Sequence, residues 1–239
     1  MWEDAPFKEI QRSLEMDLMD ELEKFVDSIS DPKLREKVKE LLYEPDISIE
    51  PSMLPLEETP AGAYMHHAYV GGLLEHTVAV TRLAITLCDL VEEVYGGEVN
   101  RDLVLAGALL HDVMKCHVYT PSEHGGYASS PLGDRIDHLS LLVAEMYKRG
   151  FPVDLIHVAA SHHGDQSPVR PKTLEALIVS IADLADSEMS RRLLRAAEYL
   201  LRQATGEKAR FTSSRKALEV VRTKTLEGWD GVRRLALES

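Results

Sequence analysis

The stretch LVLAGALLHDVMK, Leu103 to Lys115, is an apolar run that ends in an adjacent histidine and aspartate. The apolar run predicts a buried helix. A single His-Asp pair is weak evidence for a functional site, because the dipeptide is common by chance. The pair becomes informative only if other parts of the chain supply the partners that a buried imidazole and carboxylate need.

The bulk composition favours a globular protein. The chain has 239 residues, of which 44% are hydrophobic and 28% charged, enough for one large domain or one domain with an added piece. The net charge of −13 argues against dependence on nonspecific nucleic-acid phosphate contacts, although a local basic pocket for a small phosphorylated ligand remains compatible with it. Cys88 and Cys116 form no CxxC pair, which favours a reducing cytoplasm over a disulfide scaffold. No signal core or membrane-spanning apolar run is present, so no membrane partner is expected.

The hydrophobic spacing predicts an all-α chain in which any sheet is small. Asp31 is expected to cap a helix that has Pro32 at its first position, and Asn100 is expected to cap another. The proline-rich segment 44–62 and the Gly-, Ser- and Pro-rich segment 117–134 predict loops. The expected helices span about residues 7–29, 32–43, 70–95, 100–111, 135–149, 153–162 and 172–204.

These elements suggest three parts of the chain. Residues 1–62 hold N-terminal helices and a wrapping loop, residues 63–205 form the core, and residues 206–239 form a C-terminal extension packed on the core. The last 30 residues include one helical candidate, VRTKTLEGWDGVRRLALE.

Polar side chains recur at or near the ends of the central helices. Any one of them is most simply a satisfied core histidine or a helix cap. Five successive segments with such residues are harder to explain, since burying titratable groups costs several kcal/mol each unless they are paired or metal-bound. Imidazoles and carboxylates are ligands of Fe, Mn and Zn, so a metal centre is the economical hypothesis. The residues are His76, His111, Asp112, His138, His162, His163, Asp183 and Asp186.

Asp112 is the natural bridge of such a centre. Neighbouring helical side chains point about 100° apart, so His111 and Asp112 need not face one partner. A carboxylate can bind two cations, one through each oxygen. Metals ~3.5–4 Å apart can then share a hydroxide and clamp a phosphoryl group.

The order and spacing of these residues resemble the H…HD…D signature of the HD-domain phosphohydrolases, over about residues 65–190. The resemblance implies an HD-domain helical bundle with additional N-terminal helices and a C-terminal helical extension. It assigns the first metal to His76, His111, Asp112 and Asp183, and the second to Asp112, His138 and His162. His163 stays open as a ligand or a substrate contact. Met114 stands where family members often have glycine.

Two segments narrow the resemblance, HHAYVGGLLEHT and SHHGDQSPVRP. They resemble the archaeal dihydroneopterin 2′,3′-cyclic phosphate phosphodiesterases of methanopterin biosynthesis and the HD domain of bacterial 3′-5′ exoribonucleases. The resemblance implies a metal-dependent phosphodiesterase in which metal-bound hydroxide attacks the phosphorus of a small cyclic phosphate. The alternatives are a 3′-5′ exonuclease or nucleotide phosphohydrolase, and a nucleotide-binding HD module without turnover.

Several residues are candidates for contact with the substrate. Lys115 would stabilise developing charge or protonate the leaving oxygen, and its alternative is a solvated helix-end lysine. His66 and His67 would contact phosphate or the organic part, unless they form a surface pair, and His163 is a further candidate. Arg170 is an anion contact or an ordinary loop arginine.

The remaining polar residues have simpler expectations. Asp137 and Asp186 either orient a ligand histidine or cap a helix. His157 is expected to be structural. The loop residues His117 and His124 either line the pocket or are solvated, and solvation is the preferred expectation.

The expected cofactor is a pair of divalent ions, with Fe²⁺ or Mn²⁺ favoured and Zn²⁺, Co²⁺ or Ni²⁺ compatible. The expected partner is a small phosphorylated substrate. The amphipathic N-terminal helix and the C-terminal segment are compatible with a homo-oligomer.

Overall fold

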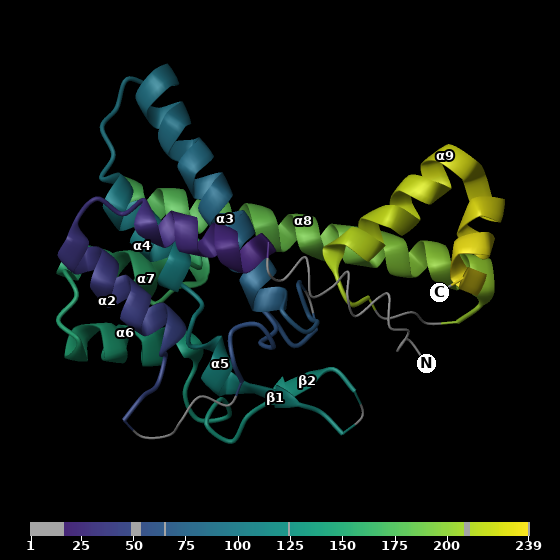
Figure 1. Ribbon diagram of the computed structural model, residues 1–239, viewed down its shortest axis with the longest axis horizontal. Coiled ribbons are helices and arrows are strands. Elements are labelled where there is room, and N and C mark those ends of the chain that lie inside the picture. The colour runs from purple at the N-terminus through teal and green to yellow at the C-terminus, as the bar shows by residue number, and fades with distance from the viewer. Residues whose placement is uncertain (1–16, 49–53, 65, 124, 208–210, 239) are drawn as a thin grey trace.

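The computed structural model describes residues 17–48, 54–64, 66–123, 125–207 and 211–238, and within these ranges the chain is almost entirely helical (Figure 1). The expected all-α class is confirmed. The N-terminal helix is seen over residues 17–27, while the apolar positions Phe7, Ile10 and Leu14 lie outside the described residues.

The elements follow one another with short connections. Within the described ranges they are α2 (Pro32–Tyr43), α3 (Gly72–Asp89) continued by a π-helical turn (Leu90–Val94), α4 (Arg101–Leu110), α5 (Lys115–Val118), β1 (Tyr119–Pro121), β2 (Tyr127–Ser129), α6 (His138–Lys148), α7 (Val153–Ser161), a 3₁₀ turn (Gly164–Gln166), α8 (Leu174–Thr205) and α9 (Ser214–Glu238), which is interrupted at Gly228.

Helices α2 and α4 begin at the capping residues predicted from the sequence. Asp31 accepts hydrogen bonds from the backbone amides of Lys33 and Leu34 at the start of α2, and Pro32 holds the first helical position. Asn100 accepts from the amide of Leu103 at the start of α4. Both caps are therefore confirmed.

The segment 117–134 departs in part from the predicted loop. Its first residues complete the short helix α5, and a two-stranded antiparallel hairpin follows, with Tyr119 opposite Ser129 and Pro121 opposite Tyr127. This is the only sheet in the described part of the chain, so the expectation that any sheet is small is confirmed. No helix among these residues is both long and apolar enough to cross a membrane.

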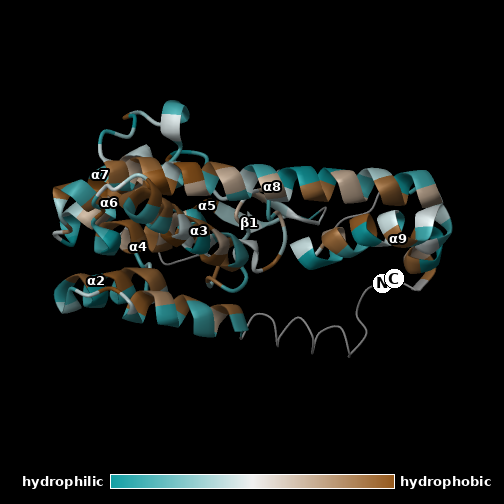
Figure 2. Cartoon of the chain, turned by 90° about the horizontal axis from the view of Figure 1, so that it is seen from above, coloured by the Kyte–Doolittle hydropathy of each residue, from teal (hydrophilic) through white to brown (hydrophobic). Residues whose placement is uncertain are grey.

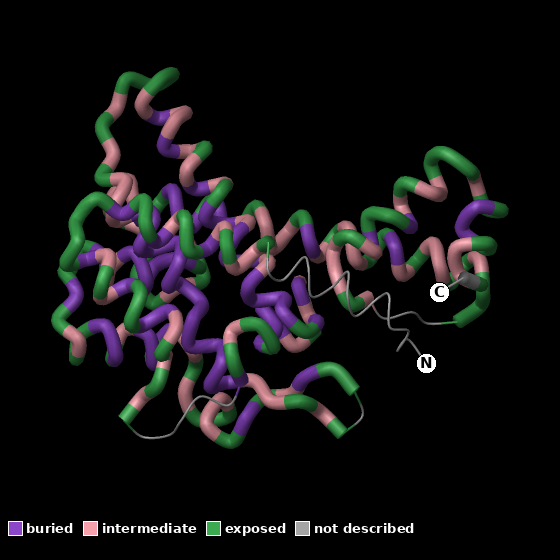
Figure 3. The backbone as a smooth tube through the Cα atoms, viewed as in Figure 1, coloured by how far each residue is buried: buried purple, intermediate pink, exposed green. Residues whose placement is uncertain are grey.

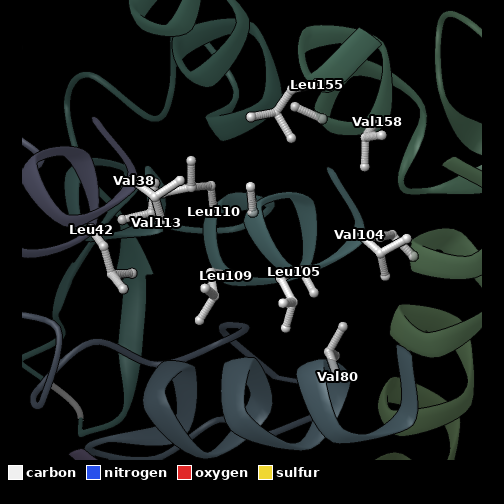
Figure 4. Close-up of a cluster of buried hydrophobic side chains, with 14 of the residues drawn as sticks. Val38, Leu42, Val80, Val104, Leu105, Leu109, Leu110, Val113, Leu155 and Val158 are labelled. Carbon is white, nitrogen blue, oxygen red and sulfur yellow. The ribbon is translucent and has the colours of Figure 1, made fainter. Parts of the chain in front are cut away.

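Helix α4 lies at the centre of the bundle. All but its first turn is buried, because apolar residues occupy every face. Figure 4 shows Leu105 and Leu109 on the side of α4 that faces Val80 of α3, while Leu110 points away from it. Figure 3 shows buried backbone concentrated around this helix. The residues that follow α4, beginning with His111 and Asp112, therefore lie inside the core.

Gly107 allows α4 and α7 to approach closely. A Cβ atom at this position would lie 2.4 Å from Cγ1 of Val158. We expect Gly107→Ala to lower the free energy of unfolding by about 1–3 kcal/mol through overpacking. In a Val158→Ala background the clash is gone, and the higher helix propensity of alanine, worth up to about 1 kcal/mol, should make the same change neutral or stabilising.

Denaturant unfolding of wild type, Gly107→Ala, Val158→Ala and the double variant measures the coupling free energy between the two positions. Equal effects of Gly107→Ala in both backgrounds would contradict the close approach.

The C-terminal half of α8 extends beyond the bundle, and α9 packs against it (Figure 1). Their contact has a small apolar core of its own, built on Ala197, Ala217, Val220 and Val232. Figure 2 shows alternating polar and apolar residues along α8, in contrast with the mostly apolar α4. The first turn of α9 nevertheless returns to the main bundle, where Ser214 meets Tyr69.

Candidate metal centre

Five helices and their ends contribute polar side chains to one buried place. His76 comes from the first turns of α3, Asp183 from α8 and His138 from the first position of α6. His162 caps the C-terminus of α7. His111 is the C-cap of α4 and keeps a helical backbone, and Asp112 follows it in the turn that separates α4 from α5.

Three of these imidazoles are fixed in orientation by their Nδ1 atoms. His111 Nδ1 donates to the carbonyl of Ala108 at 2.8 Å, and His162 Nδ1 donates to the carbonyl of Ala159 at 2.7 Å. His76 Nδ1 donates to Asp186 Oδ2 at 2.6 Å. Because Nδ1 carries a proton in each ring, Nε2 presents its lone pair to the site, as metal-ligating histidines do.

The first ligand set is defined as His76, His111 and Asp183 together with Asp112 Oδ2. Asp112 Oδ2 lies 3.3 Å from His76 Nε2 and 3.4 Å from His111 Nε2. Asp183 Oδ1 lies 3.3 Å from His76 Nε2. The ligand atoms of His76, His111 and Asp183 all fall within 4.8 Å of one another.

The second ligand set is defined as His138, His162 and His163 together with Asp112 Oδ1. Asp112 Oδ1 lies 3.2 Å from His138 Nε2 and 3.6 Å from His162 Nε2. His163 also offers a ring nitrogen within 4.8 Å of the others. The two oxygens of Asp112 thus face two different groups of imidazoles.

Several buried nitrogen and oxygen atoms of the site lack hydrogen-bond partners and are suitable ligands for divalent cations. Asp112 Oδ1, His138 Nε2 and His162 Nε2 are buried and have no hydrogen-bond partner among the described residues. His76 Nε2 and His111 Nε2 lie only 3.1 Å apart, which requires a proton or a cation between or beside them. Buried polar groups are rarely left unpaired, and imidazole and carboxylate donors suit first-row divalent ions.

The charge state of the site agrees with metal binding. Burial lowers the pKa of His138, and this outweighs the nearby Asp112 carboxylate. Burial, reinforced by His162, lowers the pKa of His163 to about 3. Burial raises the pKa of Asp112, but the Lys115 ammonium and His111 hold it well below its usual range. Burial also lowers the pKa of His76, but Asp112, Asp183 and Asp186 raise it more, and the net shift is well upward. At neutral pH the site therefore holds an ionised Asp112 carboxylate beside the neutral imidazoles of His138 and His163.

Lys115 is buried, with 4% of its surface exposed, so it is not a solvated lysine. Its Nζ donates to Asp112 Oδ2 and to the carbonyl of Ala61, both at 2.5 Å. Burial lowers the pKa of Lys115, but Asp112 raises it more, and the net shift is upward. The ammonium therefore stays charged and lies beside the bridging carboxylate.

His66 and His67 differ in their surroundings. Nε2 of His66 is buried and has no partner among the described residues, and its ring centroid lies 5.4 Å from that of His76. Burial, reinforced by Lys115, lowers the pKa of His66 to about 3. His67 instead uses both ring nitrogens, Nδ1 with Tyr69 and Nε2 with Asp186. Among the described residues, His66 therefore keeps an unpartnered ring nitrogen and His67 does not.

The remaining sequence candidates lie away from this centre or support it. Arg170 forms an exposed ion pair with Asp165, with Nε 3.2 Å from Oδ1. Asp137 caps α6 through the amide of Ser140, and His157 accepts from the amide of Lys172, which makes both structural. The expectation for His117 was wrong, because it is fully buried and donates to the Pro45 carbonyl. His124 lies outside the described residues.

Sequence reasoning left one functional residue open and missed two. Asp186 lies three residues after Asp183, so both carboxylates project from one face of α8, and this spacing is the signal that places it behind His76. Tyr69 and Ser214 join the hydrogen-bond network from separate segments. No periodicity or motif marked them.

Comparison with known proteins identifies the family of the chain. A family model described as HD domain matches residues 73–188. The chain is 42% identical over 213 residues to a dihydroneopterin 2′,3′-cyclic phosphate phosphodiesterase of Methanocaldococcus jannaschii, which covers 88% of this chain and 85% of the relative. It is 35% identical over 142 residues to a 3′-5′ exoribonuclease YhaM of Listeria monocytogenes, covering 55% of this chain and 43% of that one.

A further exoribonuclease YhaM, from Bacillus pumilus, is 28% identical over 187 residues, which cover 73% of this chain and 54% of the relative. No solved structure matches the chain significantly. The family of the chain follows from the HD-domain match and from the similarity to the M. jannaschii phosphodiesterase over most of both chains. This chain belongs to the HD-domain family of metal-dependent phosphohydrolases.

Proposed function

We propose that the chain hydrolyses a small cyclic phosphodiester at a centre of two divalent ions, and that dihydroneopterin 2′,3′-cyclic phosphate is the first substrate to test. The M. jannaschii relative bears that name and aligns with most of both chains. The observation that carries the proposal is the position of Asp112, whose two oxygens face separate ligand sets. A carboxylate with one oxygen in each ligand set would join two cations into a centre able to clamp a phosphoryl group.

When bound, the ions would supply Lewis acidity and an activated water for attack on phosphorus. The first ligand set would hold one ion and the second ligand set the other, with His163 as a ligand of the second. The roles of these residues rest on the unpartnered atoms and the short approaches at the site.

The chain's own residues account for substrate binding next to this centre. Lys115 has three N–H donors, and two of them are used by Asp112 and the Ala61 carbonyl. We propose that the third donates to a non-bridging phosphoryl oxygen and stabilises charge there as the ring P–O bond opens. His66 Nε2 would bind a second substrate oxygen, since it has no other partner among the described residues.

The metal identity is proposed from the donor set. The first ligand set has two imidazoles and two carboxylate oxygens, while the second has three imidazoles and one carboxylate oxygen. Mixed nitrogen and oxygen donors without thiolate suit Fe²⁺ and Mn²⁺, with Zn²⁺, Co²⁺ and Ni²⁺ compatible. Cys88 and Cys116 are both buried and form no disulfide with each other, which supports a reducing cytoplasm as the location.

A 3′-5′ exonuclease or nucleotide phosphohydrolase is the second candidate. The similarity to the YhaM exoribonucleases favours it, although the chain spans only 43% of the Listeria relative. The net charge of −13 weighs against a long nucleic-acid substrate, whose phosphates need a positive surface.

The deciding experiment is anaerobic purification, metal analysis, and a substrate panel. The panel contains dihydroneopterin 2′,3′-cyclic phosphate, 2′,3′-cyclic nucleotides, a short RNA, and nucleoside monophosphates. We expect metal-dependent opening of a cyclic phosphate to a monoester. Preferred shortening of RNA would support the exonuclease instead, and bound metal without turnover of any substrate would support a nucleotide-binding module.

A further inference from the structure

A chain of hydrogen bonds leads from the first ligand set to the C-terminal helix. His76 Nδ1 donates to Asp186 Oδ2 at 2.6 Å, and the same oxygen lies 2.8 Å from His67 Nε2. His67 Nδ1 lies 2.7 Å from the Tyr69 hydroxyl. That hydroxyl in turn lies 2.7 Å from Oγ of Ser214, the first residue of α9. The metal centre and α9 are thus connected by side chains far apart in sequence.

The Tyr69 hydroxyl is held from several directions. It donates to Glu75 Oε2 at 2.9 Å, and it accepts from the backbone amide of Ser214 at 3.2 Å. Glu75 immediately precedes the ligand His76 on α3. Tyr69 therefore ties the start of α9 to the helix that carries the ligand.

His67, one member of this series of hydrogen bonds, has an unfavourable backbone conformation. Its φ angle of 43° lies in the left-handed region, which residues with a Cβ rarely adopt. Its amide donates to Ser190 Oγ at 3.1 Å, and its carbonyl accepts from the amide of Ala61 at 3.2 Å. Gly72 is required beside it, since a Cβ there would lie 1.9 Å from the His67 carbonyl oxygen. Strain that the surroundings hold in place in this way is typical of functional positions.

The contacts of the hydrogen-bonded residues indicate that they orient His76 and do not form a separate metal site. His67, His76 and Asp186 have ligand atoms close enough to hold an ion. However, no atom of His67, Tyr69 or Asp186 is among the buried unpartnered atoms of the described residues, whereas atoms of the second ligand set are. The Asp186 carboxylate already accepts hydrogen bonds from His67 and His76.

We infer that Tyr69 and Asp186 are positioning residues that, together with Ser214 of α9, hold His76 in the tautomer and orientation needed to bind a divalent ion. The inference rests on the proposed function in one respect, the assignment of His76 as a ligand. Asp186 fixes the Nδ1 proton, His67 orients Asp186, and Tyr69 orients His67. The C-terminal helix is then a structural part of the metal centre.

The test measures Mn²⁺ binding to the metal-free, full-length chain by the loss of the free-ion EPR signal. A His138→Ala background leaves the first ligand set complete, and an Asp183→Ala background leaves the second complete. In the first background we expect Asp186→Asn to raise the dissociation constant about 10–100-fold, as loss of a ligand's hydrogen-bond partner does. Tyr69→Phe should raise it by a smaller factor, because Tyr69 contacts His67 and not His76 itself. In the second background the same changes should leave the dissociation constant unchanged.

Conservative variants separate positioning from general damage. Ser214→Ala should weaken binding in the His138→Ala background, and Ser214→Thr, which keeps the hydroxyl, should restore it. Thr225→Ala is the matched control, because Thr225 is an exposed residue of α9 that donates only to the Val221 carbonyl. It should leave Mn²⁺ binding unchanged.

Unchanged binding in Tyr69→Phe and Asp186→Asn would overturn the inference, as would equal weakening in both backgrounds. A third Mn²⁺ equivalent that disappears in His67→Ala would also overturn it, since the cluster would then bind an ion itself. The binding assay needs no substrate. A wild-type chain that binds Mn²⁺ yet hydrolyses nothing in the substrate panel would reject the proposed function and leave this inference standing.

Discussion

Asp112→Asn is expected to lower turnover at least about 1,000-fold and to abolish binding of one of the two divalent ions. The amide keeps the size of the side chain but removes its charge and replaces one oxygen with an NH₂ group that cannot bind a cation. One of the two ligand sets must therefore lose its bridging atom. Metal ions stabilise transition-state charge by several kcal/mol, and about 4 kcal/mol corresponds to the stated loss.

The measurement is metal content after anaerobic reconstitution together with initial rates on the substrate panel. Asp165→Asn is the matched control, because Asp165 is an exposed carboxylate paired only with the exposed Arg170. It should retain both metal and activity. An Asp112→Asn protein that binds two ions per chain would reject the bridge.

Lys115→Met is expected to destabilise the metal-free protein by about 3–5 kcal/mol, the usual effect of removing one partner of a buried ion pair. Asp112 is 1% exposed, and Lys115 donates to it at 2.5 Å. Methionine fills similar space but leaves the carboxylate without its cation. A bound divalent ion supplies positive charge to the same carboxylate, so most of the lost stability should return with metal.

Denaturant unfolding of both proteins, with chelator and with saturating Mn²⁺, gives the comparison. The stabilisation by Mn²⁺ should be larger for Lys115→Met than for wild type. Arg233→Met is a suitable control, since Arg233 pairs with Asp230 and both side chains are exposed, where such pairs contribute little. Equal loss of stability with and without metal would show that Lys115 acts through packing alone.

The sequence alone determined the helical class and singled out polar residues that the structure brings together. Asp31 and Asn100 start helices because a side-chain oxygen next to free backbone amides acts locally. The apolar run of α4 indicated a buried helix because its composition leaves no polar face. His76, Asp112 and Asp183 stood out because charged groups in apolar helices require partners.

The tertiary structure decided which atoms of these residues meet. His66 and His67 are adjacent in the sequence, but only His66 keeps an unpartnered nitrogen, because the left-handed backbone of His67 directs its ring to Asp186. No local pattern encodes the meeting of Tyr69 with Ser214, which are 145 residues apart. Local rules fix helices and caps because their contacts span a few residues, whereas the directions of side chains at the centre depend on how five helices pack together.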